Sequence, residues 1–205
     1  MTVRVKICGI TRGEDAAAAV AAGADALGFM FFEGSPRCLS HEQARAIITG
    51  VPPFIARVGV FVNPAEADVR SAIAECGIDT LQFHGEETPE FCRRFGLPIL
   101  KAFRVQDESS LKSLTQFATE AWLLDSFVPG QHGGTGAIFN WDLAAQAVSR
   151  GGRVILAGGL TPENASDAVL RVRPYALDVS SGVESAPGRK DAAKVRAFIA
   201  AAKHA

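Results

Sequence analysis

The sequence has few of the residues that would cross-link the chain. Its four cysteines, Cys8, Cys38, Cys76 and Cys92, lie far apart and form no CxxC pair. A chain of 205 residues can bury a core large enough to fold without disulfide bonds. We therefore expect reduced thiols and a cytoplasmic location. The N-terminal segment MTVRVKICGI agrees with this location, because it lacks an apolar signal-peptide region followed by a small-residue cleavage site.

An excess of charge of either sign is also missing. The chain carries 21 Lys and Arg against 22 Asp and Glu, which leaves a formal net charge of -1. Because no basic field is available to hold a polyanion, nucleic acid is not an expected partner. The most apolar stretch, residues 16–32, is rich in alanine and is interrupted by Asp25 and two glycines. We therefore expect no membrane span.

Motifs for metal ions and dinucleotides are absent as well. The sequence has no HExxH, no EF-hand spacing and no cluster of His, Cys and Asp ligands. Residues 133–136 are Gly-Gly-Thr-Gly, but they form no GxGxxG fingerprint and do not lead directly from a strand into a helix. Neither a metal ion nor a dinucleotide is therefore expected.

What the sequence does contain is a regular alternation of short apolar runs with longer amphipathic segments. Several runs are apolar on both faces, as the strands of a parallel sheet covered by helices must be. Eight strand–helix units in 205 residues favour one (β/α)8 TIM barrel domain over residues 1–205, because an open doubly wound sheet of this length has fewer strands. The predicted strands are residues 3–8, 26–31, 57–62, 80–84, 99–104, 121–126, 154–157 and 176–179.

Residues that favour helix starts follow most of the predicted strands. Two pairs have the spacing of a capping box, in which a hydroxyl and a carboxyl or amide side chain bond to each other's backbone. Three more sites place a capping side chain before a proline at the first helical position. The predicted starts are Thr11 with Glu14, Ser40 with Gln43, Asn63, Thr88, Thr161, Asn140 for a helix to Val148, and Asp191 for a last helix to Ala202.

Small residues follow the seventh and eighth predicted strands. Gly158-Gly159 comes after one strand, and Ser180-Ser181-Gly182 comes after the other. Glycine lets backbone N–H groups approach an anion closely, and a short helix after the second loop would add its positive end. The loops after strands seven and eight often bind phosphate in barrels of this kind. Tight turns would also explain glycine in either loop alone, but the two loops together predict a phosphate site.

Two ionisable side chains end predicted strands at the face where active sites of such barrels lie. Cys8 ends the first strand, before Gly9. Because a free thiol is only slightly ionised near neutral pH, a catalytic Cys8 needs a lowered pKa or a strongly acidified substrate proton. Asp125 follows the apolar run Trp122-Leu123-Leu124. Desolvation there would raise the pKa of the carboxyl, as suits a general acid, although a cap of a loop or helix is the simpler role.

Several other polar residues have two possible roles. Arg37 could be a solvated charge or could bind a carboxylate with its planar guanidinium. His84 could contact a substrate or be a wall residue. Lys6 points to the same side of its strand as Cys8, into the barrel, and we expect it to pair with Asp178 on the adjacent eighth strand. Glu184 could extend that pair. The two longest loops, residues 34–40 and 128–139, are predicted lids.

This ordered set of segments resembles the phosphoribosylanthranilate isomerases over nearly the whole chain. Phe83 stands where that family more often has leucine. The matching segments are KICGI at residues 6–10, SPR at 35–37 with Ser40, GVF at 59–61, QFHG at 82–85, Asp125, GGTG at 133–136, LAGGL at 156–160, DVSSGVE at 178–184, Pro187-Gly188 and Lys190-Asp191.

The resemblance implies an Amadori rearrangement without a cofactor, in which N-(5'-phosphoribosyl)anthranilate becomes the corresponding 1-deoxyribulose phosphate of tryptophan synthesis. It implies that Asp125 protonates the ribose ring oxygen, that Cys8 removes the C2 proton and that Arg37 holds the anthranilate carboxylate. The expected partner is a small phosphorylated substrate, and a monomer and a homodimer both fit. The other expected binding residues are His84, Gly158, Gly159, Asp178, Ser180, Ser181 and Gly182.

Two alternative functions are compatible with the same barrel. A phosphosugar lyase or aldolase would use Lys6 or Lys101 as a Schiff-base amine, which borohydride would trap in the presence of substrate. A catalytically inactive barrel would only bind a phosphorylated ligand. That alternative predicts loss of the acid or the base, and the sequence retains both Asp125 and Cys8.

Overall fold

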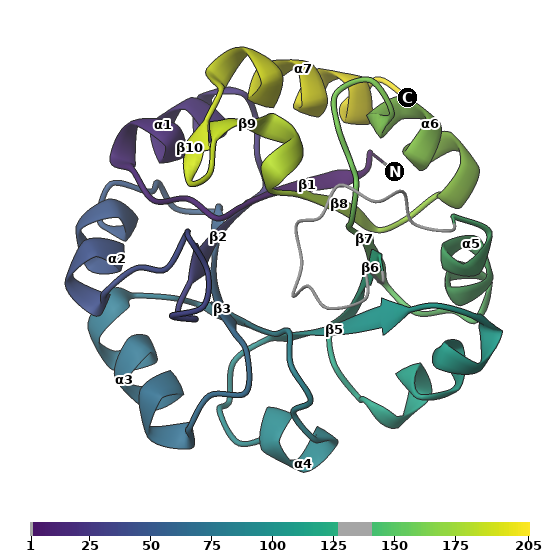
Figure 1. The fold of residues 1–205 in the computed structure, drawn as a ribbon, viewed down its shortest axis with the longest axis horizontal. Coiled ribbons are helices and arrows are strands. Elements are labelled where there is room, and N and C mark those ends of the chain that lie inside the picture. The colour runs from purple at the N-terminus through teal and green to yellow at the C-terminus, as the bar shows by residue number, and fades with distance from the viewer. Residues whose placement is uncertain (1, 127–140) are drawn as a thin grey trace.

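The eight predicted strands form a closed parallel barrel in the computed structural model, which describes residues 2–126 and 141–205 (Figure 1). Each strand pairs with the next one along the chain, and β8 pairs with β1, so the barrel has no open edge. Every predicted strand is confirmed to within one residue at each end. The strands are β1 (Arg4–Cys8), β2 (Ala26–Met30), β3 (Ala56–Phe61), β4 (Thr80–Phe83), β5 (Ile99–Val105), β6 (Ala121–Ser126), β7 (Val154–Leu156) and β8 (Ala176–Val179).

Helices form the outer ring of the barrel, with one exception (Figure 1). After β5, two 3-10 turns, η1 (Glu108–Lys112) and η2 (Leu114–Gln116), replace the predicted helix. Each turn buries one leucine, Leu111 in η1 and Leu114 in η2. The helices are α1 (Gly13–Ala21), α2 (His41–Ile48), α3 (Glu66–Cys76), α4 (Pro89–Cys92), α5 (Trp141–Ser149), α6 (Ala165–Val172) and α7 (Ala192–Lys203).

Three of the predicted helix starts are confirmed. Ser40 and Gln43 form a full capping box at α2, with backbone-to-side-chain bonds of 2.9 and 3.2 Å. Thr88 caps α4 immediately before Pro89, and Asp191 caps α7. These side chains have the spacing that local capping requires, and they lie where no distant group competes for them. Asn140 lies outside the described residues.

The other three predicted starts are wrong, because the N-caps of α1, α3 and α6 lie one to three residues later than predicted. Tertiary contacts engage two of the predicted capping side chains. The Thr11 hydroxyl donates to the Gly188 carbonyl, and the Asn63 side chain accepts a bond of 2.7 Å from the backbone N–H of Glu86. Local spacing alone cannot reveal such contacts.

The barrel interior is apolar at one end and polar at the other. Small and branched side chains from alternate strand positions fill the apolar end of the barrel. They form two clusters that include Ala102, Leu123 and Val60. The larger core lies outside the barrel, between the strands and the helices. Towards the C-terminal ends of the strands, the buried inward-facing residues become ionisable or polar: Lys6, Cys8, Gln82, Asp125 and Asp178.

A small hairpin that the sequence did not predict lies between β8 and α7. It is made of β9 (Glu184–Ala186) and β10 (Arg189–Lys190), and its turn uses Gly188 at a φ of 77°. A 3-10 turn, η3 (Ser181–Val183), connects it to β8. Figure 1 shows the hairpin on the outside of β1, next to α1. It therefore stands beside the C-terminal end of the first and last strands.

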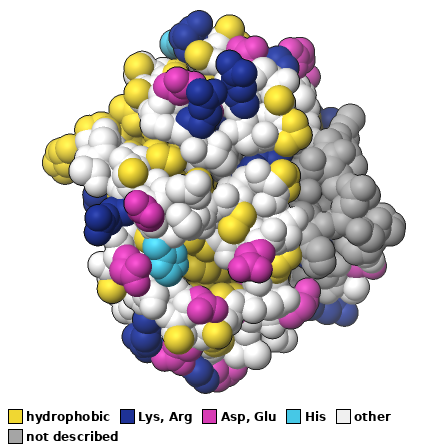
Figure 2. Space-filling view, turned by 60° about the vertical axis from the view of Figure 1, so that its left-hand side comes forward, with side chains coloured by type: hydrophobic (Ala, Val, Ile, Leu, Met, Phe, Trp, Pro, Cys, Tyr) yellow, Lys and Arg dark blue, Asp and Glu magenta, His cyan; other side chains and the backbone are white. Residues whose placement is uncertain are grey.

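The surface has no continuous field of one charge on the side that carries α2. Figure 2 shows basic and acidic side chains interspersed there, in keeping with the formal net charge of -1. In residues 2–126 and 141–205, no helix combines the length and the apolar character needed to cross a membrane.

Candidate active site

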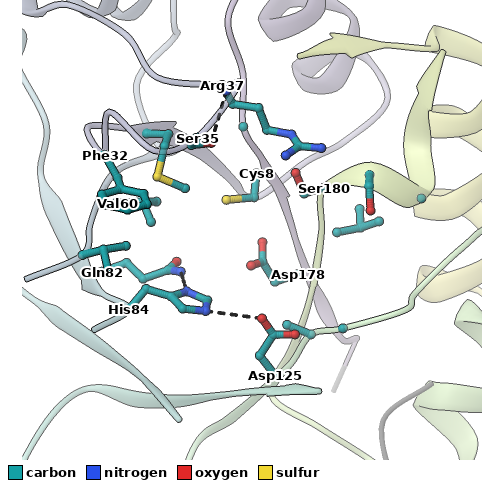
Figure 3. Close-up of a pocket in the computed structure, with 18 of the residues that line it drawn as sticks. Cys8, Phe32, Ser35, Arg37, Val60, Gln82, His84, Asp125, Asp178 and Ser180 are labelled. Atoms are coloured by element: carbon teal, nitrogen blue, oxygen red, sulfur yellow. Dashed lines mark hydrogen bonds and ion pairs between the residues drawn. The ribbon is translucent and has the colours of Figure 1, made fainter. Parts of the chain in front are cut away.

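A pocket of about 530 Å³ opens at the C-terminal end of the barrel. Its walls come from the ends of β1, β4, β6, β7 and β8 and from the loop between β2 and α2. Figure 3 shows Cys8 near the middle of this pocket, with Asp178 between it and Asp125. The structure brings together every predicted site residue: Cys8, Arg37, His84, Asp125, Gly158, Gly159, Asp178, Ser180, Ser181 and Gly182.

The loops after β7 and β8 meet at one wall of the pocket. Gly158 and Gly159 have φ values of 81° and 65°, which residues other than glycine rarely adopt. At Gly182 a methyl group would overlap the Leu160 carbonyl oxygen, so the close approach of the two loops requires glycine. Asn164 supports this wall, because its amide donates to the Gly159 carbonyl at 2.9 Å and its oxygen accepts from Thr161 N–H at 2.8 Å.

Cys8 is buried in the pocket floor beside an ion pair. Lys6 Nζ and Asp178 Oδ1 are 2.8 Å apart, which confirms the predicted pair across the β1–β8 seam. Burial raises the pKa of the Cys8 thiol above its ordinary value of 9.0, with a further increase from Asp178, and the neighbouring Lys6 only partly offsets this. The surroundings therefore do not lower the pKa of this thiol. A catalytic Cys8 would instead need a strongly acidified substrate proton.

Lys6 is held as a cation. Burial alone would lower the pKa of its ammonium group, but Asp178 and Cys8 outweigh burial and raise it. The expectation that Glu184 extends this pair is wrong. Glu184 comes after η3, on the β9–β10 hairpin, and forms ion pairs with Arg37 and Lys190 instead.

Asp125 is buried at the end of β6 and faces His84. His84 Nε2 is 3.3 Å from Asp125 Oδ2, and the Gln82 amide nitrogen donates to His84 Nδ1 at 3.1 Å (Figure 3). With Nδ1 accepting, a neutral His84 carries its proton on Nε2, next to the carboxyl. The three residues form a row of contacts that ends at the Asp125 carboxyl, where His84 Nε2 lies within contact distance without making a hydrogen bond. Gln82 was not among the predicted site residues, although it lies two positions before His84 and so shares its face of β4.

Arg37 lies on the first predicted lid and is clamped by Glu184. Its Nε and NH2 groups donate to the two oxygens of Glu184 at 2.8 and 2.6 Å, and its backbone N–H donates to Ser35 Oγ at 3.2 Å. The hydrogen bond and charge of Glu184 raise the pKa of the guanidinium. Because guanidinium has five N–H groups, Glu184 fixes its plane while using only two of them.

The two predicted lids have different outcomes. The loop at residues 34–40 contributes Gly34, Ser35, Pro36 and Arg37 to the pocket wall, as a substrate lid would. The second lid, with the Gly-Gly-Thr-Gly segment at 133–136, lies outside the described residues. In the part of the chain that the structure describes, no group of three or more His, Cys, Asp or Glu side chains could hold a metal ion.

The lysines of the alternative Schiff-base mechanism are poorly placed for it. Lys101 is buried on the outer side of β5, where its ammonium bonds Gly85 O at 2.6 Å and pairs with Glu87 at 3.1 Å. It does not line the pocket that contains Cys8 and Asp125. Lys6 is held as a cation by Asp178, and a protonated amine is not a nucleophile.

Comparison with known proteins agrees with this arrangement. The family model for N-(5'-phosphoribosyl)anthranilate (PRA) isomerase matches residues 5–201. The chain belongs to the PRA isomerase family. A relative named N-(5'-phosphoribosyl)anthranilate isomerase from Geobacter metallireducens is 59% identical over 98% of this chain and 99% of its own. Members of this family catalyse an isomerisation in tryptophan biosynthesis, and this chain is therefore an enzyme.

Solved structures of PRA isomerases have the same barrel. One shows monomers generated from the dimeric enzyme of Thermotoga maritima; it has a TM-score of 0.88 and 39% identity, and the match covers 99% of this chain and 100% of that one. Another is a PRA isomerase in complex with reduced 1-(o-carboxyphenylamino)-1-deoxyribulose 5-phosphate, with a TM-score of 0.88, 40% identity and the same coverage. The second therefore shows a PRA isomerase bound to a phosphorylated compound.

Proposed function

We propose that this chain isomerises N-(5'-phosphoribosyl)anthranilate to 1-(2-carboxyphenylamino)-1-deoxyribulose 5-phosphate, with Asp125 as general acid and Cys8 as general base. The observation that carries the proposal is that these two groups line one pocket, on either side of Asp178. The glycine loops after β7 and β8 form a side wall of the same pocket. A substrate whose phosphate is held at those loops can present its ring oxygen to one group and its C2–H to the other.

The first step opens the sugar ring. Asp125 gives its proton to the ribose ring oxygen while the lone pair of the anilino nitrogen forms a C1=N double bond and the C1–O bond breaks. The product is a protonated imine. The row of Gln82 and His84 supports this step, because it places the His84 ring 3.3 Å from the Asp125 carboxyl.

The second step moves hydrogen from C2. The Cys8 thiolate takes the C2 proton, the C2–H electrons form a C1=C2 double bond, and the C1=N electrons return to nitrogen. The resulting enolamine then tautomerises to the ketone. Because the cationic imine acidifies the C2–H bond, the reaction tolerates a base that is ionised in only a small fraction of molecules. Lys6, beside Cys8, would stabilise the thiolate when it forms.

Residues of the same pocket walls would bind the two anionic groups of the substrate, its phosphate and its carboxylate. Backbone N–H groups of Gly159 and of Ser181-Gly182 would hold the phosphate, since glycine lets the backbone approach it closely. Arg37 would hold the anthranilate carboxylate. Asp178 would accept a hydrogen bond from a ribose hydroxyl, and Ser180 and Gly158 would line the sugar between them.

A tryptophan auxotroph that lacks this isomerase provides the direct test. Expression of the chain should restore growth without tryptophan, and the purified protein should convert the ribosylamine to the ketose without added cofactor. Borohydride added with substrate should leave no covalent adduct, because the proposed mechanism forms no enzyme imine. Failure to restore growth by a folded protein, or an adduct on Lys6, would contradict the proposal.

We also propose that the chain acts in the cytoplasm as a monomer or a homodimer and binds no nucleic acid. The near-zero net charge supports the absence of nucleic-acid binding. The relative from Thermotoga maritima is dimeric and also exists as generated monomers, which supports both assembly states. Light scattering across a range of protein concentrations distinguishes the two states.

A further inference from the structure

Glu184 and Lys190 form a buried charge cluster with Arg37 that the proposed chemical steps do not use. Glu184 Oε1 accepts from both Arg37 Nε and Lys190 Nζ, each at 2.8 Å. The side chains of Lys190 and Glu184 are only 1% and 5% exposed. The pairing of Lys190 with Glu184 across the β9–β10 hairpin places the two side chains together.

Lys190 also connects this cluster to the loop after β8. Its Nζ donates to the Ser180 carbonyl at 3.1 Å. Ser180 immediately precedes the Ser181-Gly182 segment of the proposed phosphate site. A continuous row of polar contacts therefore runs from Arg37 through Glu184 and Lys190 to the phosphate loop. Figure 3 shows the Arg37 and Ser180 ends of this row on the same wall of the pocket.

The composition of the cluster is costly for stability. Two cations share one carboxylate, and burial lowers the pKa of Lys190 although Glu184 and Cys8 oppose that change. Apolar residues of similar size would fill the same space at no electrostatic cost, since buried charges lose more in desolvation than they usually regain. A surplus cation beside a pocket for a substrate with two anionic groups is instead suited to binding.

We propose that Lys190 and Glu184 are positioning residues that couple the carboxylate-binding Arg37 to the phosphate loop. Phosphate bound at Ser181-Gly182 fixes the Ser180 carbonyl, which fixes Lys190, which in turn fixes Glu184 and the plane of the guanidinium. Phosphate and anthranilate should therefore strengthen each other's binding, by the same factor in both directions. This inference rests on the proposed function, because that function assigns the two ends of the substrate.

The coupling can be measured on the wild-type protein with two fragments of the substrate. The dissociation constant of 2-aminobenzoate is measured without phosphate and with saturating inorganic phosphate, at constant ionic strength set with chloride. We expect phosphate to tighten 2-aminobenzoate binding at least about fivefold, the lower end of typical couplings. A change of less than about twofold would overturn the inference. Turnover of the full substrate, measured separately, tests the proposed function independently of this coupling.

Variants then show whether the row of contacts carries the coupling. Lys190→Met and Glu184→Gln should each reduce it to less than twofold, whereas Lys190→Arg should keep most of it. Lys194→Met is the matched control, because the Lys194 ammonium donates to the backbone carbonyl of Glu184, at 3.1 Å, and lies outside the row of contacts. This variant should leave the coupling unchanged. Thermal melts identify a variant that does not fold. If Lys190→Met does not fold, the wild-type titration and the Glu184→Gln variant test the inference. Full coupling in a folded Glu184→Gln protein would overturn it.

Discussion

Cys8 occupies a position that favours its neutral thiol. Burial and the nearby Asp178 carboxylate both raise its pKa. Lys6 and Lys190 lower it only in part, and Lys6 is itself paired with Asp178. A thiol with a raised pKa is rarely ionised, but its thiolate is a stronger base once formed. This balance suits a proton that the substrate itself acidifies, and it makes Cys8 a poor target for adventitious oxidation.

Replacement of the proposed acid or base should reduce the rate without preventing binding. We expect Cys8→Ala and Asp125→Asn each to lower kcat by about 10²–10⁴-fold, the usual contribution of one acid or base group. Cys8→Ser should be similarly impaired, because a serine hydroxyl is too weakly acidic to supply an alkoxide. Inorganic phosphate should inhibit or bind each variant as it does the wild type. Near-full activity of Cys8→Ala would remove Cys8 as the base and make His84 the candidate.

The raised pKa of Cys8 predicts a specific pH dependence. Only the thiolate is active, so activity that depends on Cys8 alone should rise with pH up to a value above 9.0. Asp125→Asn isolates this dependence, because the titration of the acid is then absent, and its residual kcat/KM should rise about tenfold per pH unit through neutrality. The difference in thiolate absorbance between wild type and Cys8→Ala gives the pKa directly. A midpoint below 8 in the free enzyme would contradict this account.

Arg37 should act mainly on binding. Its contact with a substrate carboxylate exists in the ground state and the transition state alike, so Arg37→Ala should raise KM and leave kcat nearly unchanged. The expected loss is about 1.5–3 kcal/mol, the range for a hydrogen bond to a charged group. The variant also leaves the buried Glu184 with one cation fewer, so its thermal melt must be recorded beside the kinetics. A fall in kcat with an unchanged KM would assign Arg37 another role.

The loops after β7 and β8 act as one structural element although Gly182 and Thr161 are 21 positions apart. Their contact depends on the missing side chain at Gly182, which lets the backbone of one loop lie against the Leu160 carbonyl of the other. Asn164 holds the first loop from the side, through bonds to Gly159 and Thr161. The proposed phosphate site therefore depends on packing between the loops as well as on their own turns.

Gly182→Ala should disturb this site selectively. The added methyl group cannot fit against Leu160 O, so the two loops must separate, and we expect the inhibition constant of inorganic phosphate to rise at least about tenfold with a raised substrate KM. Gly13→Ala at the start of α1 is the matched control, because its methyl group would have no atom within 4 Å. Competitive phosphate binding that is unchanged in Gly182→Ala would place the anion elsewhere.

At the scale of the whole molecule, barrel closure joins the two ends of the chain. Lys6 and Asp178, 172 positions apart, form a buried pair across the β1–β8 seam. Closure also leaves loops on the opposite face exposed. Phe54, in the loop before β3, has a fully exposed side chain and a positive φ of 70°. An L side chain is strained in that conformation and, in the single chain, gains no burial in return.

Phe54→Gly should therefore stabilise the isolated chain. Relief of the left-handed strain is worth about 1–2 kcal/mol and the added flexibility of glycine costs about 0.5–1 kcal/mol, so we expect a net gain of up to about 1.5 kcal/mol. Each kcal/mol corresponds to roughly 2–4 °C in Tm for a protein of this size. A loss of stability that depends on protein concentration would contradict the prediction and would indicate that a second copy of the chain covers Phe54.

The sequence by itself determined the strand order, the barrel and most of the polar residues at its mouth, Gln82 excepted. Strand positions follow from hydrophobic runs that are local, and consecutive parallel pairing then brings every strand end to one face. The Lys6–Asp178 pair was predictable for the same reason, since closure of an eight-stranded barrel makes the first and last strands neighbours. The family motifs added the chemistry to positions that the fold had already gathered.

Only the tertiary structure decided how those residues are paired. The partners of Arg37, the raised pKa of Cys8 and the contact between Gln82 and His84 depend on distances between segments that no local pattern records. The same holds for Thr11 and Asn63, whose side chains meet distant groups in place of capping helices. Hydrophobic periodicity is a property of neighbouring positions, whereas burial, charge pairing and hydrogen-bond competition arise only when the chain has closed on itself.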